Sequence, residues 1–440
     1  MERILLCLAH MSGNEMKYVK EAFDSNWVVP LGPNVNNFEK DLENFVNKVP
    51  VTTNERDFGD TRETLDRKVV ALSSGTAAVH LALVACGVEA GDEVIVQSFT
   101  FCASSHPVTY LGATPVFVDS EPETWNMDPV LLEEAIKDRL EKTGKKPKAI
   151  IPVALYGMPY QIDKILEIAN RYDIPVIEDA AEGFGSRFNG QVLGTFGKYG
   201  VLSFNGNKMI TTSGGGALIC QDEKEKNEIM FYATQARESY PYYQHEKIGY
   251  NYRMSNICAG IGRGQMTILE EHIRHHQHVQ EMYCELLKDV PGITMHKAPA
   301  SLSSDLDKET FDSNFWLCTA TLDSELRIKG EENAYSSVVK GAVGGAAGVT
   351  HIASCAHTDC EPNTNVEALR MALDAANVEA RPLWKPMHLQ PVYRNCPAYV
   401  NGVSESLFKM GICLPAGPYV TDDHIRYIVD TIKKACIPAP

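Results

Sequence analysis

The chain has 440 residues, of which 44% are hydrophobic and 22% are charged, and its formal net charge at pH 7 is −16. A chain of this length can bury a large core and is expected to form about two or three domains. The acidic balance, with no basic block to offset it, disfavours nucleic acid or an anionic membrane surface as the main partner. A local basic pocket for a phosphorylated substrate is still compatible with it.

The 12 cysteines are scattered through expected helices and strands. In a chain this long, such usage is typical of reduced thiols in a cytoplasmic protein rather than of a disulfide framework. Residues 1–9 contain a short apolar run without a tidy cleavage site, so we interpret them as part of the mature protein. No apolar run approaches the length of a bilayer span, so no membrane partner is expected.

The first predicted strand, 69–72, leads into the small-residue run Ser73-Ser74-Gly75-Thr76, and an apolar helix pattern from Ala77 to Cys86 follows. A strand, a small-residue turn and a helix N-terminus together form an anion site, because free backbone N–H groups and the helix dipole point at the ligand. The sequence therefore predicts a phosphate site at this turn.

Short apolar strands alternate with helical patterns between about residues 69 and 221. In the segment 161–172, apolar residues recur at helical spacing. The alternation predicts a mostly parallel sheet with helices on both faces, which binds ligands beyond the carboxyl ends of its strands. The seven expected strands are 69–72, 93–97, 115–119, 149–154, 175–179, 199–204 and 216–220.

Two charged residues follow strands of this predicted sheet. Asp179 closes the strand 175–179, and Lys208 lies in the loop after the strand 199–204. An acid at a strand end can also be a cap or turn residue, and a single lysine is usually a solvated surface side chain. Pyridoxal phosphate chemistry, however, requires a lysine that forms a Schiff base with the cofactor aldehyde and a carboxylate that keeps the pyridine nitrogen protonated. Together with the phosphate turn, the pair predicts a pyridoxal phosphate site.

The rest of the chain contains a helical pattern from about Ser255 to Leu287 and a second alternation of strands and helices from about Phe311. We therefore expect two domains. Residues 1–268 would comprise an N-terminal segment and the large cofactor-binding domain, and residues 269–440 a linking helix and a smaller C-terminal α/β domain.

Two segments look inserted, a polar one near 49–66 and a glycine- and alanine-containing one near 334–364. The second could cap the active site or extend a dimer contact. Within it, the run from Ser354 to Cys360 offers two thiols and an imidazole. Structural zinc normally takes four ligands, and no second Cys or His pair is obvious nearby, so no metal site is predicted.

Several sequence blocks, spread over nearly the whole chain, resemble the sugar aminotransferases of the DegT/DnrJ/EryC1/StrS family. The resemblance implies the fold of the fold-type I pyridoxal phosphate enzymes, with a mostly parallel seven-stranded sheet in the large domain. The Phe204–Lys208 and Trp384–His388 segments are most similar to a subgroup that aminates UDP-linked 4-keto-6-deoxy-N-acetylhexosamines on the way to bacillosamine-type sugars. The blocks are 26–33, 74–78, 99–101, 178–182, 203–216, 249–253 and 381–388.

The resemblance assigns catalytic roles to Lys208 and Asp179 and cofactor-binding roles to Phe101 and Glu182 as well. Lys208 would form the Schiff base and later act as the base that moves a proton between substrate and cofactor. Asp179 would pair with the pyridinium. Phe101 would stack on the ring face, although packing in the core is an equally ordinary use of an aromatic residue. Glu182 would lie near the phenolic oxygen of the cofactor or near the incoming sugar.

The resemblance also assigns residues that bind phosphate. Gly75, Thr76 and Ser203 would hold the cofactor phosphate within one chain. Asn251 resembles a residue that reaches across a dimer interface to the phosphate of the partner, which implies a homodimer with two shared active sites.

The nucleotide-sugar pocket has four candidate residues. A tryptophan could stack on a base or sugar face, and fixed cations are natural partners of a diphosphate. Core packing is the alternative for the tryptophan, and solvent exposure is the alternative for the cations. The candidates are Trp27, Arg253, Lys385 and His388.

The leading hypothesis is an aminotransferase that takes an amino group, from glutamate by family analogy, and transfers it to a UDP-linked 4-keto sugar for cell-surface glycan biosynthesis. Two half-reactions would give ping-pong kinetics. The alternatives are a 3-aminotransferase or a dehydratase acting on a TDP- or GDP-linked sugar, but family dehydratases lack the Schiff-base lysine. Two rivals of other classes are a regulatory protein that binds pyridoxal phosphate without turnover and a scaffold without cofactor.

Overall fold

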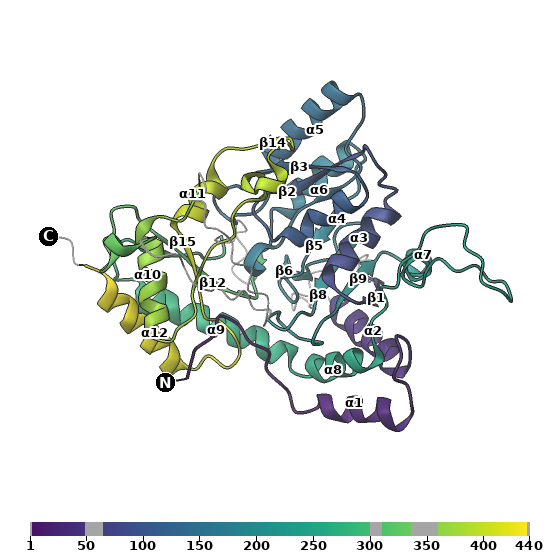
Figure 1. The fold of residues 1–440 in the computed structure, drawn as a ribbon, viewed down its shortest axis with the longest axis horizontal. Coiled ribbons are helices and arrows are strands. Elements are labelled where there is room, and N and C mark those ends of the chain that lie inside the picture. Colours follow the sequence, from purple (N-terminus) through teal and green to yellow (C-terminus); the bar gives the residue numbers. More distant parts are fainter. Residues whose placement is uncertain (1, 49–64, 300–309, 336–359, 438–440) are drawn as a thin grey trace, which may run out of the picture.

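The structure is a computed structural model that describes residues 2–48, 65–299, 310–335 and 360–437. The ribbon shows a large part, with strands between helices, beside a smaller part formed by the last third of the chain (Figure 1). The predicted insertions fall mainly on residues 49–64 and 336–359, which lie outside the described residues, as does most of the stretch from Ser354 to Cys360.

The large sheet contains all seven predicted strands. Two groups of paired strands are joined by parallel bridges from Ile150 to Val176 and from Val153 to Asp179. Among the described strands of this sheet, only β9 runs antiparallel to its neighbours, so the prediction of a mostly parallel sheet is confirmed. The order is β1 (Lys68–Leu72), β9 (Gly216–Cys220), β8 (Tyr199–Ser203), β5 (Ile177–Asp179), β4 (Ile150–Ile151), β2 (Glu93–Gln97) and β3 (Thr114–Val118).

Both faces of this sheet are covered, as expected for parallel strands. Successive residues of β1 alternate between two cores, with Val69 and Ala71 in one and Val70 and Leu72 in the other. The helices of this part are α1 (Glu15–Asp24), α2 (Pro33–Val46), α3 (Gly75–Ala85), α4 (His106–Tyr110), α5 (Pro129–Thr143), α6 (Ile162–Arg171), α7 (Glu223–Ala233) and α8 (Asn256–Met266).

The helical pattern predicted from Ser255 to Leu287 is divided into two helices, α8 and α9 (Leu269–Leu287). The break occurs at Thr267 and Ile268, where the Thr267 hydroxyl donates to the carbonyl of Gly264 and Ile268 leaves the helical region at φ −123°. A threonine hydroxyl that bonds to the preceding turn competes with the helical backbone, which accounts for the interruption.

The smaller part has an antiparallel sheet packed against α9, α10 (Thr364–Ala375) and α12 (Asp422–Ala435) around a third core. A further helix, α11 (Val403–Met410), lies beside it. The sheet order is β10 (Ile293–Met295), β12 (Cys318–Leu322), β15 (Gly411–Leu414) and β13 (Arg381–Pro382).

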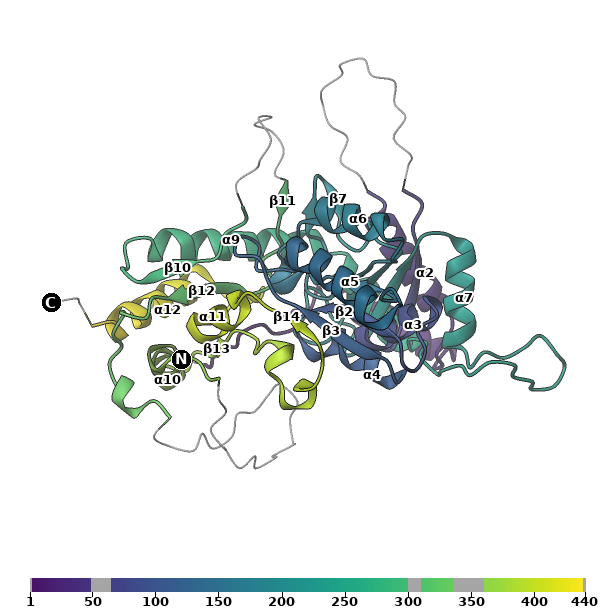
Figure 2. The ribbon, with the colours of Figure 1, turned by 90° about the horizontal axis from the view of Figure 1, so that it is seen from above.

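Several contacts join the two halves of the chain. Near the N-terminus, Ile4 pairs with Val378. From the C-terminal half, β14 (Ala398–Tyr399) extends the large sheet beside β3, and β11 (Phe311–Asp312) pairs with β6 (Arg187–Phe188), which in turn pairs with β7 (Gln191–Val192). Figure 2 shows β14 next to β3 and the N-terminus among elements of the smaller part. We propose that the two domains comprise residues 1–268 and 269–440. The strand pairings named above cross the boundary between them.

The short 3₁₀ turns are η1 (Cys102–Ser104), η2 (Leu155–Gly157), η3 (Glu331–Asn333), η4 (Met387–Leu389) and η5 (Pro391–Tyr393). Cysteines in the described ranges have free thiols. None of the helices in those ranges is both long and apolar enough to span a membrane.

Candidate active site

A cavity of about 340 Å³ lies beyond the carboxyl ends of β1, β5 and β8, where the parallel strands were predicted to place a ligand. The turn after β1, the end of β5 and the loop after β8 all contribute to its wall, and two tryptophans from the second half of the chain complete it. The predicted site residues that line this cavity are Gly75, Thr76, Phe101, Asp179, Glu182, Ser203 and Lys208.

The phosphate turn brings the first turn of α3 to the cavity. The Ser74 hydroxyl accepts a hydrogen bond from the Ala77 N–H at 3.0 Å, which caps the helix, and Gly75 and Thr76 line the cavity. A Cβ on Gly75 would lie 3.1 Å from Ser203 Cβ, and a Cβ on Gly216 would lie 2.4 Å from the Gly75 nitrogen. These two glycines therefore allow the strands to approach the helix N-terminus closely, which forms a cradle suited to a phosphate.

Asp179 is held in one orientation. It is 5% exposed; its Oδ2 accepts a hydrogen bond from Ser104 Oγ at 2.6 Å, and its Oδ1 accepts one from the Ala181 N–H at 3.1 Å. Burial raises the pKa of this carboxyl group, although both hydrogen bonds and the Lys208 charge oppose the rise. A buried carboxylate needs a cationic partner, and the protonated ring nitrogen of pyridoxal phosphate would provide one.

The Lys208 ammonium lies between a carboxylate and an aromatic face. Its Nζ is 3.3 Å from Glu182 Oε1 and 3.9 Å from the centroid of the Trp316 ring, and its side chain is 13% exposed. Both contacts favour a cation at this point. The second Glu182 oxygen accepts the Tyr156 N–H at 2.8 Å. Burial raises the pKa of Glu182, and the positive charge of Lys208 opposes that rise.

Two aromatic residues form the outer wall. Phe101 is 48% exposed, and its ring centroid lies 5.4 Å from that of Trp384. The Trp384 backbone N–H donates to the Tyr156 hydroxyl at 2.8 Å, and the two rings are stacked at 6.4 Å. This arrangement presents aromatic surface to whatever occupies the cavity.

A second hollow, of about 360 Å³, shares Thr100, Phe101 and Trp384 with the first and is therefore adjacent to it. Lys385 lines this hollow, and its Nζ donates to the Cys360 carbonyl at 3.0 Å. The predicted contact of Lys385 with a substrate diphosphate thus has space beside the cofactor cavity, and it stays a prediction.

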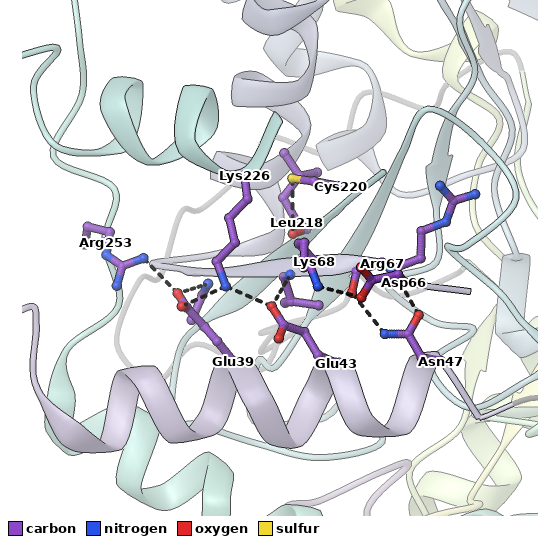
Figure 3. A network of polar contacts seen from close by, with 12 residues as sticks. Glu39, Glu43, Asn47, Asp66, Arg67, Lys68, Leu218, Cys220, Lys226 and Arg253 are labelled. Carbon is purple, nitrogen blue, oxygen red and sulfur yellow. Dashed lines mark hydrogen bonds and ion pairs between the residues drawn. The ribbon is translucent and has the colours of Figure 1, made fainter. Parts of the chain in front are cut away.

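Arg253 forms an ion pair with Glu39 away from the cavity. Its Nη1 is 2.8 Å from Glu39 Oε1 in a buried ion pair, and Lys226 Nζ lies 3.5 Å from the other Glu39 oxygen and 2.8 Å from Glu43 (Figure 3). Arg253 is not among the described residues that line the cavity. Its position favours a structural role over the predicted contact with substrate.

The two glutamates of this network also bind the edge of the large sheet. Glu39 accepts the Ala71 N–H at 3.0 Å and Glu43 accepts the Val69 N–H at 2.9 Å, so two backbone donors of β1, at the end of the strand order, are satisfied. An unpaired strand edge is a template for unwanted pairing, and buried backbone donors need partners. We call Glu39, Glu43, Lys226 and Arg253 the edge network.

Three further predicted residues do not line the cavity in the described part of the chain. Trp27 is partly exposed, and its carbonyl accepts a hydrogen bond from Asn256. His388 Nδ1 lies 2.6 Å from Ser98 Oγ. Asn251 is exposed and forms an antiparallel bridge with Thr234. Since the role predicted for Asn251 requires a second copy of the chain, that role stays a prediction.

Residues that the sequence did not single out also line the cavity. Ser104 binds Asp179, Trp316 lies against Lys208 and Trp384 faces Phe101. Trp384 lies inside a block that resembles the family, so it could have been chosen from the sequence beside Lys385. Ser104 and Trp316 carry no local pattern that separates them from other serines and buried tryptophans.

Comparison with known proteins identifies the family. The DegT/DnrJ/EryC1/StrS aminotransferase family matches the chain over residues 9–329 and 346–433. The chain belongs to this family. The prediction made from the sequence blocks is therefore confirmed.

Individual relatives extend over almost the whole chain. EpsN of Bacillus subtilis (strain 168), which has a provisional name as a pyridoxal phosphate-dependent aminotransferase, is 39% identical over 436 residues, covering 98% of this chain and 95% of EpsN. GDP-perosamine synthase of Escherichia coli O157:H7 is 31% identical over 424 residues, covering 96% of each chain.

Among solved structures, an aminotransferase of the same family from Brucella abortus is similar, with a TM-score of 0.76 and 26% identity over 96% of this chain and 95% of its own. These findings agree with the predicted fold class and with pyridoxal phosphate as the predicted cofactor.

Proposed function

We propose that the protein is a pyridoxal phosphate-dependent aminotransferase that moves an amino group, taken from glutamate, to the keto carbon of a nucleotide-linked 4-keto-6-deoxy sugar. One observation carries the proposal: the Lys208 amine, the Asp179 carboxylate and the first turn of α3 all line a single cavity. A cofactor aldehyde, a ring nitrogen and a phosphate need these three kinds of partner in one place.

Bound pyridoxal phosphate supplies an aldehyde that combines with amines and a ring that accepts the electrons of a broken bond. Gly75, Thr76 and Ser203 would bind its phosphate at the helix N-terminus. Asp179, oriented by Ser104, would keep the ring nitrogen protonated. The Lys208 amine would attach the cofactor and afterwards carry a proton to and from the reacting carbon.

The remaining wall would orient the substrate and limit the access of water. Glu182 contacts the Lys208 ammonium and lines the cavity, and we propose that it lies near the phenolic oxygen of the cofactor or near the incoming sugar. Phe101 and Trp384 close one side with aromatic surface. A cavity that excludes water strengthens each of these electrostatic contacts.

We assign the sugar to the UDP-linked N-acetylhexosamines, because the Phe204–Lys208 and Trp384–His388 segments resemble the enzymes that aminate such sugars for polysaccharide biosynthesis. GDP-linked sugars are the second candidate, favoured by full-length relatives that are named GDP-perosamine synthases. Trp27, Lys385 and His388 are the residues proposed to contact the sugar nucleotide.

The experiment is a spectroscopic titration. Addition of glutamate to the purified protein with cofactor should abolish the visible absorbance band of the lysine-bound cofactor, and one 4-keto sugar from a panel of UDP-, GDP- and TDP-linked compounds should restore it. The compound that restores the band names the substrate. A band that ignores every donor and every sugar would instead indicate a protein that binds pyridoxal phosphate without turnover.

We further propose a homodimer with shared active sites. The segment between α7 and α8 projects from the body of the molecule (Figures 1 and 2) and exposes Tyr242, Tyr243 and Ile248. Asn251 bridges Thr234, which directly follows α7, so it lies where the segment returns to the body. Large exposed apolar side chains are typical of interaction surfaces.

Mixing two inactive variants tests the shared sites. A Lys208→Ala protein and an Asn251→Ala protein, each with little activity alone, should regain activity when they exchange subunits, because one site of the mixed dimer has both residues intact. No recovery in a mixture that forms mixed dimers would contradict a role for Asn251 across the interface.

A further inference from the structure

Helix α9 directs two buried histidines toward the loops around Lys208. His272 and His276 are 3% and 0% exposed and lie four residues apart, so they occupy neighbouring positions on one face of the helix. His272 Nδ1 is 3.1 Å from the Met209 carbonyl oxygen, and His276 Nδ1 is 3.1 Å from the Phe315 carbonyl oxygen.

These contacts show that Nδ1 of each ring carries a proton. A carbonyl oxygen only accepts hydrogen bonds, so each imidazole must carry its proton on Nδ1. The Nε2 atoms of His272 and His276 are buried and have no hydrogen-bond partner among the described residues. Burial lowers the pKa of His272 and lowers that of His276 to about 3, so both rings are neutral donors at physiological pH.

The two carbonyl groups belong to the segments that enclose the lysine amine. Met209 directly follows Lys208, and Phe315 directly precedes Trp316, whose ring centroid is 3.9 Å from Lys208 Nζ. The Trp316 indole N–H also donates to the Asn207 carbonyl at 2.6 Å. The two segments are therefore bound to each other and to the same face of α9.

Phe315 adopts a backbone conformation that is costly without such support. Its φ of +45° lies in the left-handed region, which non-glycine residues adopt only where the surroundings impose it. The hydrogen bond from His276 to its carbonyl, together with the bond from the Trp316 N–H to Asn314 Oδ1 at 2.8 Å, maintains this turn. This backbone turn places the Trp316 ring against Lys208 Nζ.

We propose that His272 and His276 are positioning residues, which hold the two loops so that the Lys208 amine stays between Glu182 and Trp316. The inference rests on the proposed role of Lys208 in catalysis. The test, however, measures the chemical reactivity of the Lys208 amine in protein without cofactor. Its outcome is therefore independent of the aminotransferase activity.

The experiment compares side chains whose N–H donors lie at different distances from the helix backbone. An asparagine places its amide nitrogen where Nδ1 of histidine lies, a glutamine places it near Nε2, and a leucine has no donor. The variants are His276→Asn, His276→Gln and His276→Leu, with the same series at position 272. His278→Leu is the matched control, because His278 lies on the same helix and contacts Asp422 at a solvent-exposed position.

The main readout is the rate at which an amine-acylating reagent modifies Lys208 in the cofactor-free protein, measured by peptide mass spectrometry relative to the exposed Lys20. Loss of one such hydrogen bond should loosen the loop and raise the labelling rate by about fivefold in the Gln and Leu variants. The Asn variants and His278→Leu should stay within about twofold of the wild type.

A second readout is the kcat of the holoenzyme. The Gln and Leu variants should lose kcat by about tenfold or more, because a misplaced amine costs rate steeply. Their affinity for inorganic phosphate as a probe of the cradle at α3 should be unchanged.

Equal Lys208 labelling in the Asn, Gln and Leu variants would overturn the inference, whether or not their melting temperatures fall. If a Leu variant does not fold, the Asn and Gln pair decides the question, because both are polar and differ only in reach. A labelling difference between Asn and Gln in a protein that never transaminates would support the positioning role while contradicting the proposed function.

Discussion

Two regions of the molecule bury charged groups, and they differ in how those charges are balanced. In the edge network, Glu39 and Glu43 face Lys226 and Arg253, so two negative charges meet two positive ones. Among the described residues that line the cavity, the charged ones are Asp179, Glu182 and Lys208, so two carboxylates share one cation. Buried charges are stable only when they are paired.

The balance of charge distinguishes a structural network from a binding site. The edge network is complete within the chain, and its carboxylates also accept backbone N–H groups of β1. The cavity has an excess of negative charge next to a helix N-terminus, and burial raises the pKa of both of its carboxyl groups. A ligand with a cationic ring nitrogen and an anionic phosphate would complete both ends.

The largest effect is expected at Lys208, the one cation among the described residues of the cavity wall. Lys208→Ala should abolish turnover, to below a thousandth of the wild-type rate, because both the attachment of the cofactor and the proton transfer depend on this amine. Loss of the borohydride-reducible covalent cofactor, seen by mass spectrometry, checks the change. Lys226→Ala removes a cation from the edge network instead, and it should keep that adduct. A reducible adduct in Lys208→Ala would show that another lysine binds the cofactor.

The next effect is expected at the carboxylate that would meet the ring nitrogen. Asp179→Asn keeps the shape but loses the negative charge, so it should weaken cofactor binding and lower kcat by about a hundredfold or more. Steady-state kinetics and cofactor titration measure the two effects. Ser104→Ala, which removes only one hydrogen bond to Asp179, should cost about tenfold or less. Normal turnover in Asp179→Asn would mean that this acid has been assigned the wrong role.

Breaking the edge network should affect stability rather than chemistry. Glu39→Ala leaves the buried Arg253 guanidinium and the Ala71 N–H without this partner, so the free energy of unfolding should fall by about 3 kcal/mol. Urea denaturation measures the loss. The double variant Glu39→Ala, Arg253→Ala should be less destabilised than the sum of the two single variants. A large change in kcat at unchanged stability in the Arg253→Ala variant would instead support the predicted contact of Arg253 with substrate.

The smallest effect concerns pH in the absence of cofactor. Because the folded-state pKa values of Asp179 and Glu182 are raised above the ordinary 3.8 and 4.5, the native state binds protons more tightly than the unfolded chain. Stability should therefore fall as pH rises from the ordinary carboxyl range through the raised values, and it should be lowest above them. Melting temperatures across about pH 4 to 8, the range in which carboxyl groups and histidines titrate, measure this slope.

Asp179→Asn sharpens that last measurement. Without cofactor, the variant should show a flatter decline of stability with rising pH than the wild type, since one of the two raised carboxyl groups is gone. Pyridoxal phosphate added to the wild type should flatten the decline as well. Identical pH profiles for the two cofactor-free proteins would show that Asp179 does not carry the excess charge.

Much of the candidate site could be predicted from the sequence because it depends on local order along the chain. Ser74, Asp179 and Ser203 follow or end buried apolar strands, and parallel strands end at one edge of their sheet. Lys208 lies only a few residues beyond such a strand. These residues were predicted to meet, and the cavity contains them all.

Other parts of the site depend on contacts between distant segments. Trp316 reaches Lys208 from the second half of the chain, and Ser104 reaches Asp179 from a 3₁₀ turn. Neither position has a periodicity or spacing that indicates its partner. The β14 strand was also not predicted, because two residues are too few to show an alternating pattern.

The sheet, the phosphate turn and the order of acid and lysine along the chain could be predicted, since apolar periodicity and small-residue turns act over a few residues. The pairing of cations with carboxylates depends on contacts between distant segments and could not. Arg253 and Lys208 both lie in segments that resemble the family, yet one is paired with Glu39 at the sheet edge and the other faces the cavity. A buried charge is balanced by whichever opposite charge the fold brings within a few ångströms, and that distance is not encoded in sequence spacing.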